Sequence, residues 1–216
     1  MYLDWTLLEL TRQIVSHTIS PEIMRAKPKQ LELPTRGGRR KGAGRPRGNR
    51  VSHAARPHFD RVTPVHVTLR MQEHVWNLRS GRSWRRIRRA FERARGRFGM
   101  RLIHFSVQGN HLHLIVEADD HRALARAMQG LCIRIAKALN AMMEASGRVF
   151  DDHYHSRLLR SPTELVRAIR YVLGNHEHHF GVKGVDPYSS AVLEEMEVVV
   201  SEPRGWLLRV GWRLAS

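Results

Sequence analysis

The chain has 216 residues, of which 42% are hydrophobic, so it can bury the core of one domain of ordinary size. No long uncharged apolar run occurs, and Asp4, Glu9 and Arg12 interrupt the first fifteen residues, so we expect neither a membrane span nor a signal peptide. The single cysteine, Cys132, excludes an internal disulfide and a thiolate cage for a metal ion, and it fits a reducing cytoplasm.

The charge is the strongest functional signal in the composition. The chain carries a formal net charge of +17, and arginine far outnumbers lysine. Arginine binds phosphate through a planar bidentate fork, and a basic chain of this size attracts polyanions. We therefore expect a protein that binds nucleic acid.

Residues 1–60 are predicted to form a basic, largely disordered N-terminal arm. Leu3 to about His17 has the pattern of a short amphipathic helix, whereas the Gly- and Arg-rich residues 36–50 have no apolar period. Within that stretch, Arg45 and Arg47 flank Pro46 as in an AT-hook, which binds the DNA minor groove. The match is short, which favours a non-specific basic arm that contacts DNA.

Residues 61–182 are predicted to form the main domain, which begins with a strand over residues 64–70. A helix is expected from Arg82 to about Phe98, with Trp84, Ile87, Phe91 and Phe98 on its buried stripe and Gly99 as its C-terminal cap. The opposite side of this helix is basic, and a solvated surface or a contact with the DNA backbone would both explain it. We expect DNA contacts from Arg85, Arg86, Arg88, Arg89 and Arg93.

Two more strands are expected at residues 101–108 and 111–118, joined by a two-residue turn at Gly109-Asn110 and supplying the centre of the sheet. Asp119-Asp120 should cap a long helix that runs to about residue 145. Residues 148–160 read as a loop that enters a fourth strand, and a last helix is expected from Pro162 to about His176.

The element order is therefore strand, helix, strand, strand, helix, strand, helix. This order matches an α+β, ferredoxin-like antiparallel sheet with helices on one face and an extra C-terminal helix. Residues 183–216 read as a partly ordered tail that could either cover an edge strand or contact a partner.

Two pairs of residues have spacings that could support chemistry. His111 and His113 lie two apart on one strand, so both imidazoles project from the same face. They could be half of a divalent-metal site, or simply two polar residues on a solvent face. Tyr171 and Asn175 lie four apart on a helix, so a nucleophilic phenol and an amide oxygen can approach one centre.

In combination, the sequence segments around these two pairs resemble those of the single-tyrosine HUH transposases of bacterial insertion sequences, and especially the REP-associated tyrosine transposases. The block Asn110-His111-Leu112-His113-Leu114-Ile115 carries the paired histidines, and Tyr171-Val172-Leu173-Gly174-Asn175 carries the helical tyrosine. A block between them, residues 150–157, ends in Tyr154, His155, Ser156 and Arg157. The resemblance covers residues 61–180, although His176 stands where the family usually has proline.

The resemblance implies a specific chemistry. His111, His113 and Asn175 would hold a magnesium or manganese ion, and Tyr171 would attack a phosphate of single-stranded or hairpin DNA. The products would be a 5′-phosphotyrosyl enzyme and a free 3′-hydroxyl, in a homodimeric protein of the bacterial cytoplasm and nucleoid. His66 is a lesser candidate, for a place beside the metal ligands.

Tyr154 is a rival nucleophile, but it lacks the helical amide partner of Tyr171. It precedes Arg157 and Arg160, and we expect all three to contact DNA, with the Tyr154 ring stacking a base.

Two other functions stay open at this stage. A catalytically inactive relative could bind DNA hairpins with the same fold and the same basic surface. An RNA-binding ferredoxin-like protein is less consistent with the sequence, because the strand HLHLIVE has no aromatic pair.

Overall fold

The computed structural model describes residues 56–180, 184–192 and 198–215, with the side chains of residues 175–180 left out. The expected N-terminal helix and the residues Arg45 and Arg47 lie outside this part of the chain. Phe59 packs into the domain core and its carbonyl accepts a hydrogen bond from the backbone N–H of His121, 3.0 Å away, although the sequence assigns it to the arm.

The main domain has the element order expected from the sequence, and a four-stranded antiparallel sheet lies at its centre. The strands follow the order β2-β3-β1-β4 across the sheet. The elements, in chain order, are β1 (Thr63–Arg70), α2 (Gly81–Ala94), β2 (Met100–Val107), β3 (His111–Ala118), α3 (His121–Met143), β4 (His155–Leu158), α4 (Pro162–Phe180), α6 (Trp206–Arg209) and the 3-10 helix η1 (Gly211–Leu214).

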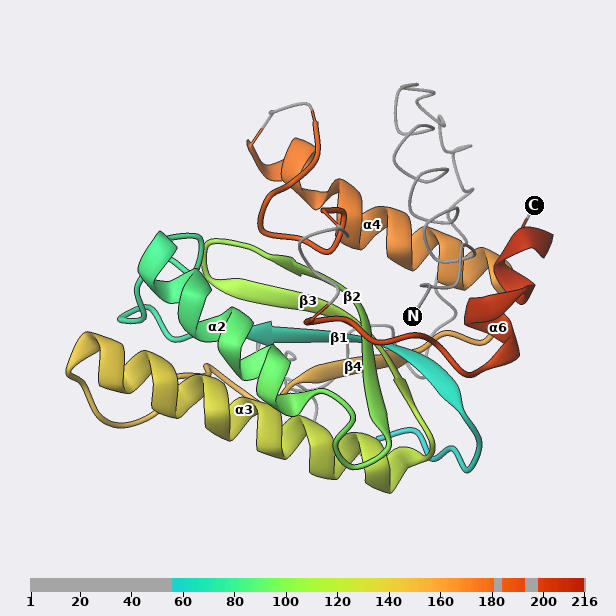
Figure 1. The fold of residues 1–216 in the computed structure, drawn as a ribbon, viewed down its shortest axis with the longest axis horizontal. Coiled ribbons are helices and arrows are strands. Elements are labelled where there is room, and N and C mark those ends of the chain that lie inside the picture. Colours follow the sequence, from blue (N-terminus) through green and yellow to red (C-terminus); the bar gives the residue numbers. More distant parts are fainter. Residues whose placement is uncertain (1–55, 181–183, 193–197, 216) are drawn as a thin grey trace, which may run out of the picture.

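The two faces of the sheet carry different side chains and different helices (Figure 1). Helices α2 and α3 cover one face, where alternate residues such as Val67 and Leu114 enter the larger hydrophobic core. Helix α4 lies on the opposite face, where Ile103 and Ile115 meet Ile169 and its neighbours in a smaller core. Because successive strand residues alternate between faces, the polar residues of β1 and β3 point to the α4 side.

Short polar side chains begin the three long helices, and the sequence predicts the Asp120 cap of α3 but not the Ser80 cap of α2. Asp120 accepts the backbone N–H of Ala123 at 2.6 Å and caps α3, and Ser80 accepts that of Ser83 at 3.2 Å in α2. Ser161 accepts the backbone N–H of Glu164 at 3.2 Å at the start of α4. Each cap satisfies a backbone donor that has no partner within its own helix.

Helix α2 ends earlier than expected. It stops at Ala94, and the backbone then adopts positive φ angles at Gly96 (67°), Phe98 (58°) and Gly99 (72°). The predicted extension to Phe98 is wrong because the left-handed conformation at Gly96 ends the helix first. Phe98 consequently leaves the buried stripe and is 49% exposed.

Strand β2 lies at an edge of the sheet, so the expectation that the β2–β3 hairpin supplies both central strands is wrong; β3 and β1 are central. The chain after α4 runs along the edge of β2. The backbone N–H of Val107 donates to the carbonyl of Tyr188 at 2.9 Å, and that of Ser190 donates to Phe105 at 3.0 Å. Covering an edge strand in this way satisfies backbone groups that would otherwise face solvent.

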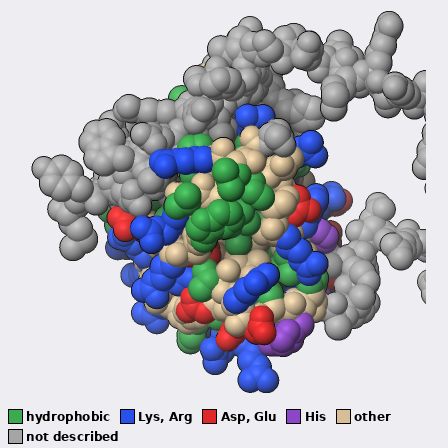
Figure 2. Space-filling model, turned by 90° about the vertical axis from the view of Figure 1, so that its right-hand side faces the viewer, with side chains coloured by type: hydrophobic (Ala, Val, Ile, Leu, Met, Phe, Trp, Pro, Cys, Tyr) green, Lys and Arg blue, Asp and Glu red, His purple; other side chains and the backbone are tan. Residues whose placement is uncertain are grey.

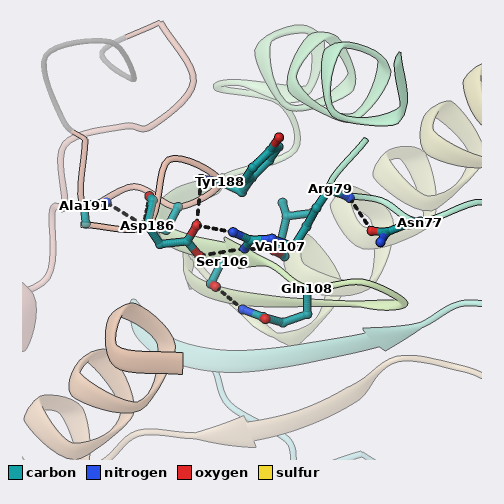
Figure 3. A network of polar contacts seen from close by, with 9 residues as sticks. Asn77, Arg79, Ser106, Val107, Gln108, Asp186, Tyr188 and Ala191 are labelled. Carbon is teal, nitrogen blue, oxygen red and sulfur yellow. Dashed lines mark hydrogen bonds and ion pairs between the residues drawn. The ribbon is translucent and has the colours of Figure 1, made fainter. Parts of the chain in front are cut away.

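A buried ion pair fixes this covering segment (Figure 3). Arg79, at the end of the β1–α2 loop, donates two hydrogen bonds to Asp186, of 2.8 and 2.9 Å, and one of 2.9 Å to the Val107 carbonyl. Its guanidinium also lies 4.4 Å from the centre of the Tyr188 ring. The segment is therefore attached to both the β1–α2 loop and β2.

The last described residues form α6 and η1, which pack on α4 through Leu208 and Trp212. The buried carboxylate of Glu117 on β3 accepts the backbone N–H of Arg204 and of Gly205, both at 2.7 Å. Figure 2 shows the face of the molecule toward which α6 lies, with a hydrophobic patch among basic side chains. No helix in the described ranges is long and apolar enough to cross a membrane.

Candidate active site

The two histidines of the HLH block project from β3 toward the α4 side of the sheet. Leu112 between them is fully buried in the core on the other side, which fixes the face that they occupy. Their ring centres are 4.8 Å apart, with the rings nearly perpendicular. His113 is only 4% exposed, whereas His111 at the end of the strand is half-buried.

Two side chains of β1 contact His113 from the neighbouring strand. Thr68 lies directly opposite His113 in the register of the two strands. The Nδ1 atom of His113 is 3.2 Å from Nε2 of His66 and 3.3 Å from Oγ1 of Thr68. Burial, together with the nearby charges of His155 and Arg157, lowers the pKa of His66 to about 4. His66 is therefore neutral at pH 7, and its Nε2 atom can accept a hydrogen bond from the Nδ1–H of His113.

Helix α4 places a tyrosine beside these rings. Val172 and Leu173 bury the inner side of the helix against the sheet, and Tyr171 next to them is 49% exposed. The centre of its ring lies 5.2 Å from that of His113 and 6.0 Å from that of His66, in edge-to-face arrangements. These residues, with His111 and Thr68, form what we call the histidine–tyrosine cluster.

The donor set of this cluster suits a divalent cation in part. Nδ1 of His111 lies 2.9 Å from Oδ1 of Asn110, and Nδ1 of His113 is engaged by β1, so the Nε2 atom of each ring is the one that a metal ion would use. Such outer contacts fix the tautomer and orientation of metal-binding imidazoles. Asn175 lies one helical turn beyond Tyr171, but its side chain is outside the description. No group of three or more His, Cys, Asp or Glu side chains that could hold a metal ion occurs in the described ranges.

The short strand β4 adds basic groups on the same face. Arg157 lies opposite His66 in the register, and His155 lies opposite Thr68. Both are exposed, as is Arg160 just after the strand. Arg157 forms a long ion pair of 3.4 Å with Glu164 at the start of α4. The structure thus brings positive charge next to the histidine–tyrosine cluster.

The arginines of α2 lie on the other side of the sheet from this cluster. Helix α2 packs on the face opposite α4 (Figure 1). Most arginines of this helix are exposed to solvent. Arg88 is half-buried and pairs with Glu92 at 3.2 Å. The exposed members of the expected set are Arg85, Arg86, Arg89 and Arg93.

Tyr154 also lies away from the cluster. It is 8% exposed within the core on the α3 side, and the guanidinium of Arg56 covers its ring at 3.7 Å. Burial raises the pKa of its phenol, an effect that Arg56 opposes. The ring borders an open cavity of about 890 Å³ next to α3, but it offers little surface for a stacked base.

The sequence did not predict Thr68, a member of the cluster, or His155 beside it as site residues. A signal for Thr68 is present in the first strand, where Pro64, His66, Thr68 and Arg70 alternate with Val65, Val67 and Leu69. Such alternation predicts a polar strand face, but not that this face lies next to that of His113.

Comparisons with known proteins support the fold. No family model matches the chain, and no curated protein matches it. Its structure is similar to a solved structure of a REP-associated tyrosine transposase bound to a REP hairpin, with a TM-score of 0.57 and 13% sequence identity. The similarity covers 72% of this chain and 92% of that chain. At this identity the likeness shows a shared fold, the ferredoxin-like α+β sheet with its covering helices.

Proposed function

We propose that the protein is a transposase-type nuclease and strand transferase that acts on single-stranded or hairpin DNA. The observation that carries the proposal is the contact of Tyr171 on α4 with His66 on β1 and with His113 on β3, whose ring also contacts that of His111. A phenol that is half exposed beside imidazoles on a basic surface suits attack on a phosphodiester. The net charge of +17 supports a polyanionic substrate.

Tyr171 is the proposed nucleophile. Its phenol oxygen forms a bond to phosphorus as the bond between phosphorus and the 3′-oxygen breaks. The phenol loses its proton to solvent or to a neighbouring base, and the departing 3′-oxygen takes up a proton. The phosphate stays bonded to the enzyme and to the 5′-oxygen of the DNA fragment that follows the break, so attack by a 3′-hydroxyl can rejoin strands without an external energy source.

His111, His113 and Asn175 would hold a magnesium or manganese ion. When bound, the ion neutralises the charge that develops on the scissile phosphate. His66 and Thr68 orient the His113 ring, and Arg157 adds positive charge on the same face. Arginine side chains at this position would hold the phosphates that flank the scissile bond.

A covalent adduct is the direct test. The full chain is incubated with Mn²⁺ and a labelled DNA hairpin that has single-stranded flanks, and the products are separated on a denaturing protein gel. We expect a labelled protein band that requires Mn²⁺ and disappears in Tyr171→Phe. The matched control is Tyr154→Phe, because Tyr154 lies on the other side of the sheet and should leave the adduct intact.

The other outcomes separate the competing functions. Tight hairpin binding without an adduct under any metal condition would overturn the nuclease and favour a binding protein with the same fold. An adduct that is lost in Tyr154→Phe and kept in Tyr171→Phe would overturn the choice of nucleophile.

A further inference from the structure

The loop between β1 and α2 carries an exposed tryptophan that the proposed chemistry does not use. Trp76 is 46% exposed, and the guanidinium of Arg82, at the start of α2, lies 5.3 Å from the centre of its ring. Aromatic rings with arginine beside them are the surfaces on which proteins stack unpaired bases. The first turn of α2 has no acidic residue that would repel a phosphate next to such a base.

The loop holds Trp76 in place. Leu78, two residues further on, is fully buried, and its backbone N–H donates to the carbonyl of Gly109 at 2.9 Å. Asn77 accepts the backbone N–H of Arg79 at 2.9 Å through its side chain, and Arg79 is fixed by Asp186 (Figure 3). The exposure of Trp76 is therefore a property of an anchored loop, so little conformational entropy would be lost when a base binds.

The loop also lies between the two basic regions of the molecule. The hydrogen bond from Leu78 to Gly109 joins it to the turn just before His111, so the Cα atoms of Trp76 and His111 are at most about 20 Å apart. The loop leads into α2, whose arginines are on the opposite face of the sheet from the histidines. One path for a DNA strand that contacts both faces leads past this end of the sheet.

We propose that Trp76 is a stacking site for one unpaired base of the DNA, with Arg82 supporting the ring. This inference rests on the proposed function for its ligand, single-stranded DNA, but not on the cleavage chemistry. It assigns to the β1–α2 loop the recognition of a base a few nucleotides away from the scissile phosphate.

The test measures binding without metal ions, so that no DNA is cut. A hairpin with single-stranded flanks carries the fluorescent base 2-aminopurine at one flank position at a time, and a second hairpin has no flanks. We expect the fluorescence of 2-aminopurine to be quenched on binding at one position, because stacking on an indole ring quenches the fluorescence of this base. Trp76→Ala should abolish that quenching and weaken binding of the flanked hairpin about tenfold. Binding of the hairpin without flanks should not change.

Two further variants make the result specific. Trp76→Phe keeps an aromatic face and should restore most of the affinity. Trp206→Ala removes another exposed tryptophan, 59% exposed on α6 at the opposite end of the molecule, and should have no effect (Figure 1). Circular dichroism checks that each variant is folded.

The inference is overturned if Trp76→Ala binds flanked DNA as the unchanged protein does, or if Trp206→Ala causes an equal loss. The first result would leave a protein partner as the reason for the exposed ring. Failure of the covalent-adduct test leaves this measurement intact, because it needs neither Tyr171 nor a metal ion. Loss of quenching with a normal adduct would reject the stacking site and keep the nuclease.

Discussion

His113 contacts every other member of the histidine–tyrosine cluster. Its Nδ1 atom meets His66 and Thr68, and its ring packs against those of His111 and Tyr171. Because it is almost fully buried, its orientation depends on these neighbours rather than on solvent. His66 is therefore the residue at which the outer support of the proposed metal ligand can be tested.

We predict that His66→Phe weakens Mn²⁺ binding by about tenfold, because Nδ1 of His113 loses the nearer of its two partners and keeps only Thr68. Isothermal titration with Mn²⁺ in the absence of DNA measures the effect. His66→Gln keeps a hydrogen-bond acceptor, so its affinity for Mn²⁺ should lie between that of the unchanged protein and that of His66→Phe. His153→Phe, at an exposed histidine in the loop before β4, is the control, and an equal loss there would contradict the assignment.

At the scale of elements, one buried ion pair reinforces the backbone hydrogen bonds that attach the chain after α4 to strand β2. Asp186 has a fully buried side chain, and its partner Arg79 is 11% exposed. A carboxylate left alone in such a place loses its hydration without compensation. The edge of β2 and the end of the β1–α2 loop therefore depend on the same contact.

Arg79→Met should lower the free energy of unfolding by about 3–5 kcal/mol, as expected when one partner of a buried ion pair is removed. Urea denaturation followed by circular dichroism provides the value. The double variant with Asp186→Leu should recover much of the loss, because no buried charge remains. Arg157→Met, which removes an exposed pair, should change the value by less than about 1 kcal/mol. A similar loss of stability in Arg79→Met and in Arg157→Met would argue against this account.

Helix α2 allows a test of whether its arginines bind DNA or only face solvent. Each phosphate contact contributes a slope of about 0.7–0.9 to the dependence of log affinity on log salt. Replacing the exposed Arg85 and Arg89 by Gln should therefore reduce this slope by between one and two, measured by fluorescence anisotropy over a range of salt. The same replacements at Arg209 and Arg213 serve as a control for net charge. An unchanged slope in the α2 variant would show that the arginines of α2 face solvent and do not contact DNA.

For the whole molecule, buried histidine makes stability depend on pH. His104 on β2 is fully buried and its Nδ1 lies 3.1 Å from Oγ of Ser190 in the covering segment. Burial lowers its pKa from 6.5 to about 4. Between these values the unfolded chain binds a proton that the folded chain does not, so stability decreases as the pH falls from 6.5 toward 4 and is unaffected above 6.5.

The expected loss from His104 over this range is up to about 3 kcal/mol. Urea denaturation at pH 7.5, 5.5 and 4.5 measures it. His104→Asn should make the profile less steep, because the amide does not titrate, but not flat, because His66 with its pKa of about 4 remains. His74→Gln on the exposed β1–α2 loop should leave the profile unchanged. An identical slope in His104→Asn and the unchanged protein would show that other groups dominate acid unfolding.

The sequence predicted the order of elements in the main domain because its hydrophobic periods and caps are local signals. Spacing together with family resemblance also predicted that the paired histidines and Tyr171 lie close together. Local patterns could not show which strand lies at the sheet edge, since β2 and β3 are both almost fully buried. The packing of the tail on β2, and the contact of His66 with His113, depend on residues far apart in the chain.

The half-exposed ring of Tyr171 has a consequence for selectivity. A nucleophile in a deep cleft rejects bulky substrates by shape, whereas Tyr171, as the proposed nucleophile, would be accessible to a folded DNA as readily as to a short oligonucleotide. Discrimination would then have to come from contacts remote from the reacting atoms, and substitutions there could redirect the protein to new DNA sequences without altering its reactive centre.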